Sequence, residues 1–482
     1  MRRSVLVPGV AFVSIGLGIL GGCRTSENPT QAAASPELPS IHSCSSPVQL
    51  QSESIREQLR SEDFTALEQH LQALHAAAMA DISCEDRLED AYAVFADASN
   101  WLDAPLDHWV AQRPEGSEAH AARGTHLNAV GRARRGPGYI RETPSESLAA
   151  MHEAFARAIP DLVRATQLEP TNPVPYTSLI QIAAHEGTDA SRDEILARGL
   201  AAIPNSYAIR VEYVYYLQPM WGGSIEEMQR FALKEQASIE LNPKIRWLLA
   251  EPPRAAGLRL LEDGKSEEAR PLLEQAVEIR GKYKDHVALL RAYRQLGDHR
   301  RVIRTATRCL EMDPNDAWLY MQRAVAYVSI HQNERALADA DRAVECASED
   351  PAIAYNRAFV IHSALGQNAA IPAYEKILVI DPNFRPALDK LNGIFREQKR
   401  YREAEPLARR VTELFPNDAD AWFTYAGVLY CLKDPNAKAA LKRFLDLADR
   451  RKAEDRKRVE YVENLLAVKF GGKPAAPEAS GG

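Results

Sequence analysis

The sequence has few of the features that mark an all-β protein, a thiol-redox enzyme or a polytopic membrane protein. Long runs of Val, Ile and Thr and a regular series of Asn-Gly turns are missing, which argues against an all-β fold. Only six cysteines occur in 482 residues and none form a Cys-x-x-Cys pair, so a redox motif or a zinc knuckle has no support. Beyond the first 22 residues no stretch is long and apolar enough to cross a bilayer.

Catalytic signatures are lacking as well. Gly264-Lys265-Ser266 is not a phosphate-binding loop, because Arg259 stands where that loop needs a glycine. His185-Glu186 is not followed by the second histidine of a His-Glu-x-x-His zinc motif, and no nucleophile elbow stands in a suitable setting. We therefore expect no catalytic residue, metal or cofactor from motifs alone.

The charge balance is acidic. The chain has 59 Lys and Arg against 66 Asp and Glu, a formal net charge of −7, and most basic residues are interleaved with acidic ones. This disfavours nucleic acid as a partner. A composition of 45% hydrophobic and 26% charged residues is that of a globular protein, and the length predicts more than one unit.

The N-terminus has the pattern of an export signal. Met1-Arg2-Arg3 is positively charged, and an uncharged segment, 5–20, follows it. Leu20-Gly21-Gly22-Cys23 resembles the lipobox of bacterial lipoproteins, which implies a cleaved signal peptide over 1–22 and a lipid on the Cys23 thiol. The alternative is an ordinary secretory signal with a chance cysteine.

The segment 23–50 that follows is rich in Ser, Thr, Pro and Ala and is predicted to be a flexible linker. Arg24 stands where an aspartate would retain an enterobacterial lipoprotein in the inner membrane, so that sorting rule implies the outer membrane, facing the periplasm. Cys44 and Cys84 are the one pair that we predict as a disulfide. The remaining cysteines fall on predicted helices, where a buried small side chain is expected.

Evenly spaced turns show an internal repeat in the second half of the chain. Pro314, Pro382 and Pro416 lie 68 and then 34 residues apart in similar Asp/Asn-rich turns. The turns define units 283–316, 317–350, 351–384, 385–418 and 419–452, preceded by 250–282. Position 8 of a unit is mostly small, as in Gly257 and Ala324, and position 11 is mostly large and apolar, as in Tyr327. This pattern closely resembles the tetratricopeptide repeat (TPR) family.

The resemblance implies helix pairs that stack into a right-handed superhelix over residues 246–452. Residues 453–470 carry an apolar stripe at helical spacing and are predicted to cap the last pair, while 471–482 form a disordered tail. The resemblance also implies that positions 2, 5, 9, 12 and 13 of the first helix line a concave groove. The residues there include Arg291, Arg294, Trp318, Met321, Val325, Tyr355, Phe359, His362, Arg396, Phe423 and Tyr430.

Aromatic anchors together with arginines predict a protein or peptide partner with some preference for acidic segments. For Trp318 and Val325 packing on the preceding unit is an equal alternative. The groove lacks the Lys/Asn pair of repeats that clamp a free C-terminal carboxylate, because Val287 and Arg291 stand at those positions.

Residues 51–245 are predicted to form a more irregular helical domain. An uncharacterised bacterial domain family that accompanies TPRs is similar to this part of the chain. The similarity is carried, in this order, by a Trp (Trp109), an Arg-Gly pair (Arg123-Gly124), a basic Gly-containing loop (131–138) and Trp-Gly-Gly-Ser (221–224). The family supplies no activity.

Two readings of these loops stay open. Trp221, Gly222 and Gly223 form either a tight turn before Ser224 as helix N-cap, or a ligand loop. The arginines Arg132, Arg134, Arg135 and Arg141 either bind a phosphate, carboxylate or glycan acid, or pair with neighbouring carboxylates. Arg123 is a further candidate ligand residue.

The sequence thus predicts an all-α protein, a helical N-terminal domain followed by a TPR α-solenoid. The preferred function is a lipid-anchored, non-enzymatic protein-binding scaffold of the cell envelope. One alternative is an enzyme or small-ligand-binding domain at 51–245 that the repeats recruit. Another is an assembly factor for a pilus, a secretion system or the cell-wall synthesis machinery.

Overall fold

A computed structural model describes residues 48–136, 142–186 and 191–470, and this part of the chain contains helices and no strand. The predicted signal peptide, Cys23, Cys44, Arg141, most of the linker and the predicted tail lie outside the described residues. None of the described helices is both long enough and apolar enough to cross a membrane. The all-α prediction is confirmed.

The chain divides into two compact units. The boundary along the sequence falls between Ala292 and Tyr293, inside helix α13. We call the described residues 48–292 the N-terminal unit and 293–470 the C-terminal unit. Helices of the N-terminal unit are α1 (Val48–Arg60), α2 (Phe64–Ala80), η1 (Ile82–Cys84), α3 (Glu85–Tyr92), η2 (Asn100–Leu102), α4 (Asp103–Gln112), α5 (Ser117–Arg135), α6 (Ser145–Leu168), α7 (Pro173–Glu186), α8 (Arg192–Ala202), α9 (Tyr207–Tyr215), η4 (Pro219–Trp221), α10 (Ile225–Glu235), η5 (Gln236–Ser238), η6 (Pro243–Ala250), α11 (Glu251–Glu262), α12 (Ser266–Ile279) and most of α13 (Tyr283–Gln295).

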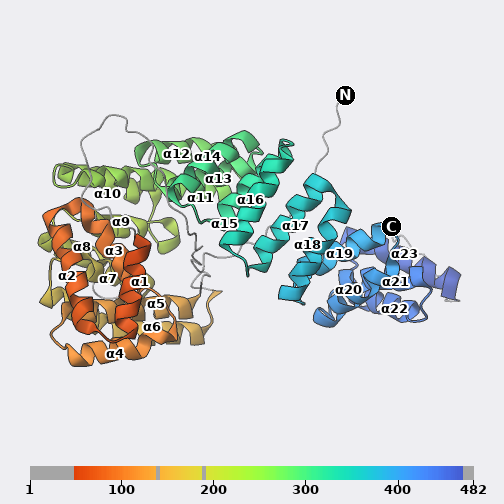
Figure 1. The fold of residues 1–482 in the computed structure, drawn as a ribbon, viewed down its shortest axis with the longest axis horizontal. Coiled ribbons are helices and arrows are strands. Elements are labelled where there is room, and N and C mark those ends of the chain that lie inside the picture. Colours follow the sequence, from red (N-terminus) through yellow and green to blue (C-terminus); the bar gives the residue numbers. More distant parts are fainter. Residues whose placement is uncertain (1–47, 137–141, 187–190, 471–482) are drawn as a thin grey trace, which may run out of the picture. The chain divides into compact units, whose positions relative to one another are not determined.

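The C-terminal unit continues with regular helix pairs. They are α14 (His299–Met312), α15 (Ala317–Ser329), α16 (Asn333–Cys346), α17 (Pro351–Leu365), α18 (Gln367–Ile380), α19 (Arg385–Glu397), α20 (Tyr401–Leu414), α21 (Ala419–Leu432), α22 (Ala437–Leu447) and α23 (Ala453–Phe470). Each helix from α15 to α23 packs on the next, so consecutive pairs stack (Figure 1). Helices α13, α15, α17, α19 and α21 begin at the first residues of the five 34-residue units, as a TPR solenoid requires.

Aspartates in the inter-repeat turns explain why the helices begin there. The Asp313 carboxylate accepts the Asn315 N–H at 3.1 Å and closes the turn, and Asp316 then caps α15 by accepting the Leu319 N–H at 2.9 Å. Asp418 caps α21 in the same way, through the N–H groups of Asp420 and Ala421. These bonds pair N–H groups of the first helical turn that have no partner within the helix.

Small residues let paired helices approach closely. A Cβ on Gly131 of α5 would lie 2.4 Å from the Phe155 ring of α6, and one on Gly124 would lie 2.6 Å from Leu162. Gly257 of α11 meets Leu273 of α12 in the same way, also at 2.6 Å. The small residue expected at position 8 is therefore needed at this crossing.

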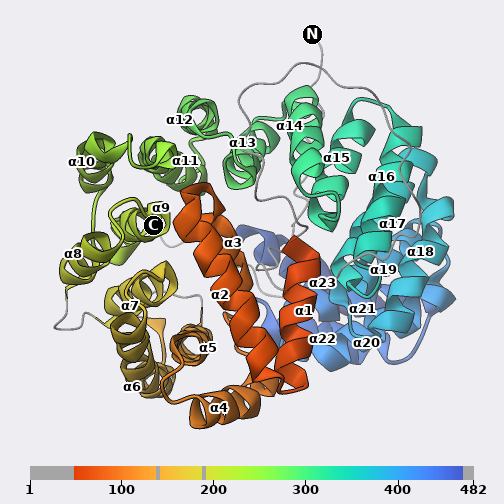
Figure 2. The same ribbon diagram turned by 60° about the vertical axis from the view of Figure 1, so that its left-hand side comes forward.

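The N-terminal unit has its first core around Trp109 of α4. The indole is fully buried, stacks on Phe64 with ring centroids 5.8 Å apart, and donates its Nε1–H to Glu68 at 3.0 Å. Helices α1, α2 and α3 pack on one another around this core (Figure 2). Cys84, at the end of η1, is disulfide-bonded; the pairing with Cys44 stays a prediction.

Candidate functional site

The first helices of the repeats carry the predicted groove residues, and most of these side chains are half-buried. Trp318, Phe359 and His362 are of this kind, as is Arg294, which donates to Gln322 at 3.2 Å. Arg396 on α19 is exposed, and Arg291 is half-buried in the N-terminal unit. Val325 packs partly against the core formed by α15, α16 and α17, so its contact here is with its own and the following repeat; the alternative of packing on the preceding unit stays a prediction.

The assignment of Met321 to the groove is wrong. Its side chain is fully buried in the core formed by α15, α16 and α17. Alanines at 324, 336 and 340 leave a gap there, and the flexible thioether fills it.

Phe423 and Tyr430 on α21 are not part of an open groove either. The Phe423 ring lies 5.0 Å from the Phe444 ring, and the Arg458 guanidinium of α23 lies 5.3 Å from Phe423. Tyr430 meets Phe470, also of α23, with ring centroids 6.5 Å apart. The C-terminal helix covers this face because the last pair has no further repeat to pack on.

Polar groups without partners remain between α17 and α21. His362 Nδ1 and Asn392 Oδ1 are buried and have no hydrogen-bond partner in the described chain. Burial lowers the pKa of His362, with Lys390 of α19 acting in the same direction. Asn392 and Arg396 line a depression of 290 Å³ between α19, α20 and α21, together with Arg385, Asp389 and Asp420.

Tyr355 has a packing role beside this depression. Its ring lies 5.6 Å from Tyr374 and 5.9 Å from Phe384, and burial raises its pKa. Of these two aromatic residues, Phe359 is the better one to test as an anchor, because no aromatic ring of the described chain packs on it.

In the N-terminal unit, the structure brings two of the predicted ligand loops together. The Arg135 guanidinium at the end of α5 lies 5.5 Å from the centre of the Trp221 ring in η4. His185 at the end of α7 lies 4.6 Å from the same ring, and Tyr216 lies 5.0 Å from it. We call Arg132, Arg135, His185, Tyr216 and Trp221 the Arg–aromatic cluster. His185 and Tyr216 were not predicted as members, since nothing in the sequence aligns α7 and α9 beside α5.

Gly222 and Gly223 shape the turn and are not ligand donors. Gly222 has φ +85°, and a Cβ on Gly223 would lie 2.2 Å from the Leu217 carbonyl oxygen. Their N–H groups donate to Pro219 at 3.2 Å and to Gln218 at 3.3 Å. Ser224 caps α10 through the Glu227 N–H, so this half of the motif is the predicted structural turn.

Arg123 and Arg134 are engaged elsewhere. Arg123 donates to both oxygens of Asp161, at 2.7 and 2.9 Å, and to Asp107 at 3.1 Å, so it stabilises α5 against α6 and α4. Arg134 is exposed and lies 3.7 Å from Glu153. The ligand-site interpretation is therefore wrong for Arg123, whose carboxylate partners are within the fold.

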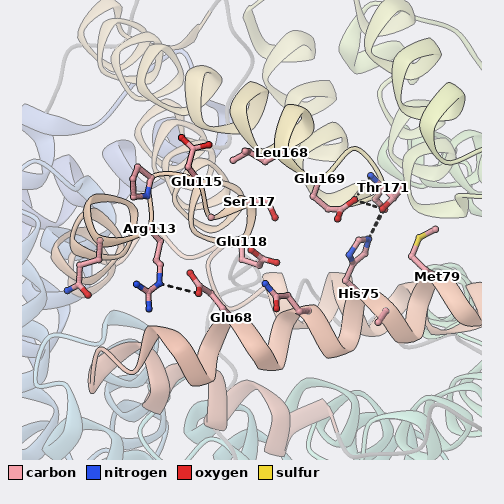
Figure 3. Close-up of a pocket in the computed structure, with 15 residues that line it drawn as sticks. Glu68, His75, Met79, Arg113, Glu115, Ser117, Glu118, Leu168, Glu169 and Thr171 are labelled. Carbon is pink, nitrogen blue, oxygen red and sulfur yellow. Dashed lines mark hydrogen bonds and ion pairs between the residues drawn. The ribbon is translucent and has the colours of Figure 1, made fainter.

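An open pocket of 840 Å³ that was not predicted lies between α2 and the adjacent ends of α4–α7 (Figure 3). Its wall includes four glutamates, Glu68, Glu115, Glu118 and Glu169. Glu68 accepts from Trp109 and from Arg113, and His75 Nε2 lies 3.0 Å from the Thr171 carbonyl oxygen. Segments from residues 68 to 171 form this wall, so no local sequence pattern marks it.

Comparison with known proteins gives one family match. The family described as a domain of unknown function, DUF4034, matches residues 177–237. This interval contains His185, Tyr216 and Trp221 but not the arginines of α5. No curated protein matches the chain.

Several solved structures are similar to the chain. YrrB, described as a TPR protein with an unusual peptide-binding site, is 16% identical over 39% of this chain and 97% of its own, with a TM-score of 0.30. Pseudomonas aeruginosa PilF is 16% identical over 44% and 96%, with a TM-score of 0.34. The Cut9–Hcn1 hetero-tetramer of the APC/C is 12% identical over 86% and 90%, with a TM-score of 0.33.

Proposed function

We propose that the protein is a protein-binding scaffold whose C-terminal unit binds an extended peptide segment across α17 and α19, next to the depression between α19, α20 and α21. The observation that carries this proposal is the depression lined by Asn392 and Arg396, where Asn392 Oδ1 is buried without a partner and Arg396 is exposed. His362 Nδ1 on α17 is a second buried atom without a partner. Buried polar atoms without partners are costly, and an extended peptide offers N–H and C=O groups that complement both of them.

The predicted preference for acidic partners rests on fewer arginines than the sequence analysis named. Arg385 is occupied by Asp389 and Asp418, whereas Arg396 makes no ion pair within the described chain. Arg396 is therefore the arginine of this depression available to a carboxylate. Phe359, half-buried one turn before His362, supplies apolar contact area for the same segment.

We also propose that a lipid on Cys23 holds the scaffold at the cell envelope, on the outer membrane and facing the periplasm. Support comes from the lipobox-like Leu20-Gly21-Gly22-Cys23 and from Arg24 after it. A tethered scaffold would act by concentrating its partner at the membrane surface.

The binding test uses dodecapeptides selected from a random displayed library on the intact chain. Arg396→Glu should weaken the selected acidic peptides at least about tenfold, as should Phe359→Ala. Arg409→Glu is the matched control, because this arginine lies on α20 with a side chain 55% exposed. Undiminished binding by both folded groove variants would place the site elsewhere.

A further inference from the structure

Polar side chains form rows across helices α5, α7 and α9 of the N-terminal unit. Helix α7 packs on both α5 and α9, and side chains at three- and four-residue steps along these helices meet their counterparts on the neighbour. The rows are Thr125 with Ser178, then Asn128 with Gln181 and Glu212, and then Arg132 and Arg135 with His185 and Tyr216.

The first two rows are joined by hydrogen bonds between their own members. Thr125 Oγ1 lies 3.4 Å from Ser178 Oγ. Asn128 donates to Gln181 at 2.6 Å, and Gln181 donates to Glu212 at 2.9 Å. The third row, which is the Arg–aromatic cluster, differs because three of its N–H donors lack acceptors, whereas the unpartnered atom of the second row, Asn128 Oδ1, is an acceptor.

Three buried N–H groups of this cluster have no hydrogen-bond partner in the described chain: Arg132 Nε, Arg135 Nε and Trp221 Nε1. They come from two separate segments, the end of α5 and η4. The Arg135 guanidinium lies 5.5 Å from the Trp221 ring, and both arginines act electrostatically on His185, whose ring lies 4.6 Å from Trp221. Unpaired buried donors are rare in folded proteins, and such a group in a native structure calls for an explanation such as a bound ion or ligand. All three are donors, so the missing group must be an acceptor.

Among the described residues, none neutralises the two guanidinium groups. Glu212 is the nearby carboxylate that acts electrostatically on Arg132, but it accepts its hydrogen bond from Gln181, and burial raises its pKa. Neither Arg132 nor Arg135 makes an ion pair with a described residue, whereas Arg134 between them lies beside Glu153. Two positive charges at one helix end therefore remain available for an anion.

His185 adds an aromatic wall without adding charge. Its Nδ1 lies 2.7 Å from the Gln181 carbonyl oxygen, which only accepts, so Nδ1 carries the proton. Burial, followed by the nearby Arg135 and Arg132, lowers the pKa of this imidazole. The rings of His185, Tyr216 and Trp221 limit the access of water, which strengthens hydrogen bonds to an anion.

We propose that Arg132, Arg135 and the Trp221 indole N–H bind an oxyanion, the carboxylate or phosphate group of a small ligand or of a protein segment. A guanidinium group presents Nε and Nη to two oxygens of such a group at once. The three residues are half-buried, so each keeps some surface that a ligand can approach. This site is independent of the proposed peptide groove, and either can fail without the other.

The test follows the indole N–H of Trp221 by NMR in the intact, ¹⁵N-tryptophan-labelled chain during titration with inorganic phosphate and, separately, with acetate. The chain has six tryptophans, so Trp221→Phe identifies the resonance. We expect a saturable downfield shift with one of the two anions, and the responding anion distinguishes phosphate from carboxylate recognition. The absence of a saturable shift with both would overturn the proposal.

Affinities for the responding anion, measured by calorimetry, assign the donors. Arg132→Gln with Arg135→Gln should bind at least about tenfold more weakly, because two charge-assisted hydrogen-bonding groups are lost. Arg134→Gln, which removes one positive charge from the same turn, should bind like the original chain. An equal loss in Arg134→Gln would show a general charge effect and overturn the site.

Trp221→Phe keeps an aromatic ring in η4 and removes a single donor. It should weaken binding of the responding anion while the helical circular dichroism signal stays the same. This variant decides the question if the double arginine variant does not fold. Undiminished affinity in folded Trp221→Phe would exclude the indole from the site.

Discussion

At the scale of single residues, the clearest electrostatic feature is His120 of α5. Its Nδ1 lies 2.7 Å from Asp161 Oδ1, and its Nε2 lies 3.0 Å from the Pro114 carbonyl oxygen. Both neighbours are acceptors, so the ring satisfies both only when each nitrogen carries a proton. The hydrogen bond to Asp161 raises the pKa of His120 above its ordinary value, although burial opposes this.

The raised pKa predicts a pH dependence of folding. A group whose pKa is higher in the folded state stabilises the fold fully below its ordinary value of 6.5 and loses that contribution as the pH rises through its folded pKa. Urea unfolding at a series of pH values should show this loss above about pH 6.5. In His120→Gln that component should be absent, at a cost of roughly 1–2 kcal/mol on the acidic side.

His108→Gln is the control for this measurement, because the His108 side chain is 60% exposed and pairs with Glu62 at the surface. Subtracting each variant's profile from that of the original chain removes the contributions of the other histidines. A His120→Gln profile parallel to the original would mean that His120 is neutral in the folded protein.

At the scale of helices, the regular part of the fold was predictable from the sequence. Turns with aspartates and prolines recur every 34 residues, and the helices begin where those turns end. This pattern is strong because the first helix of each repeat begins in the same way, at capping residues of the same kind. In the N-terminal unit the signal is weaker, since α5 and α6 are held by close approach at Gly124 and Gly131, which local patterns do not reveal.

The candidate sites were predictable only in part. Family positions placed Met321 in the groove, but whether such a residue faces solvent depends on the size of its neighbours in space. Phe423 and Tyr430 lie under α23, a contact between segments that sequence spacing does not encode. The sequence indicated Arg132 and Arg135 in one loop and Trp221 in another. The packing of α7 on α5 and α9 brings the two together.

The terminal helix α23 offers a test of capping. Val462 is fully buried against the last repeat, whereas Val468 on the same helix is 77% exposed. Val462→Asp places an unpaired carboxylate in an apolar contact and should lower the free energy of unfolding by about 3 kcal/mol. Val468→Asp should change it by less than about 0.5 kcal/mol.

Thermal unfolding of both valine variants, followed by circular dichroism, measures this difference. Equal transition temperatures for the two would show that α23 does not stabilise the last repeat. The expected order instead makes the helix a cap, which a solenoid needs because its last pair has no successor to cover it.

At the scale of the whole molecule, the prediction to test is attachment to a membrane through a lipid anchor. The lipobox-like segment ends at Cys23, and in that chemistry a diacylglyceryl group joins the thiol sulfur before the signal peptide is removed. Each buried methylene of an acyl chain contributes roughly 0.8 kcal/mol to membrane binding, so a chain with two or more acyl groups is held stably. Serine has no thiol, and Cys23→Ser should therefore stay unlipidated.

Cells that produce the original chain and Cys23→Ser should be fed an alkyne analogue of palmitate and then fractionated. The original chain should carry the label and sediment with membranes, while Cys23→Ser should be unlabelled and should accumulate as a soluble or uncleaved form. Cys44→Ser is the matched control, because it removes a nearby cysteine, the predicted disulfide partner of Cys84, and leaves the lipobox-like segment intact. Label in Cys23→Ser, or its loss in Cys44→Ser, would contradict a lipid anchor on Cys23 and with it the proposed place of the scaffold at the envelope.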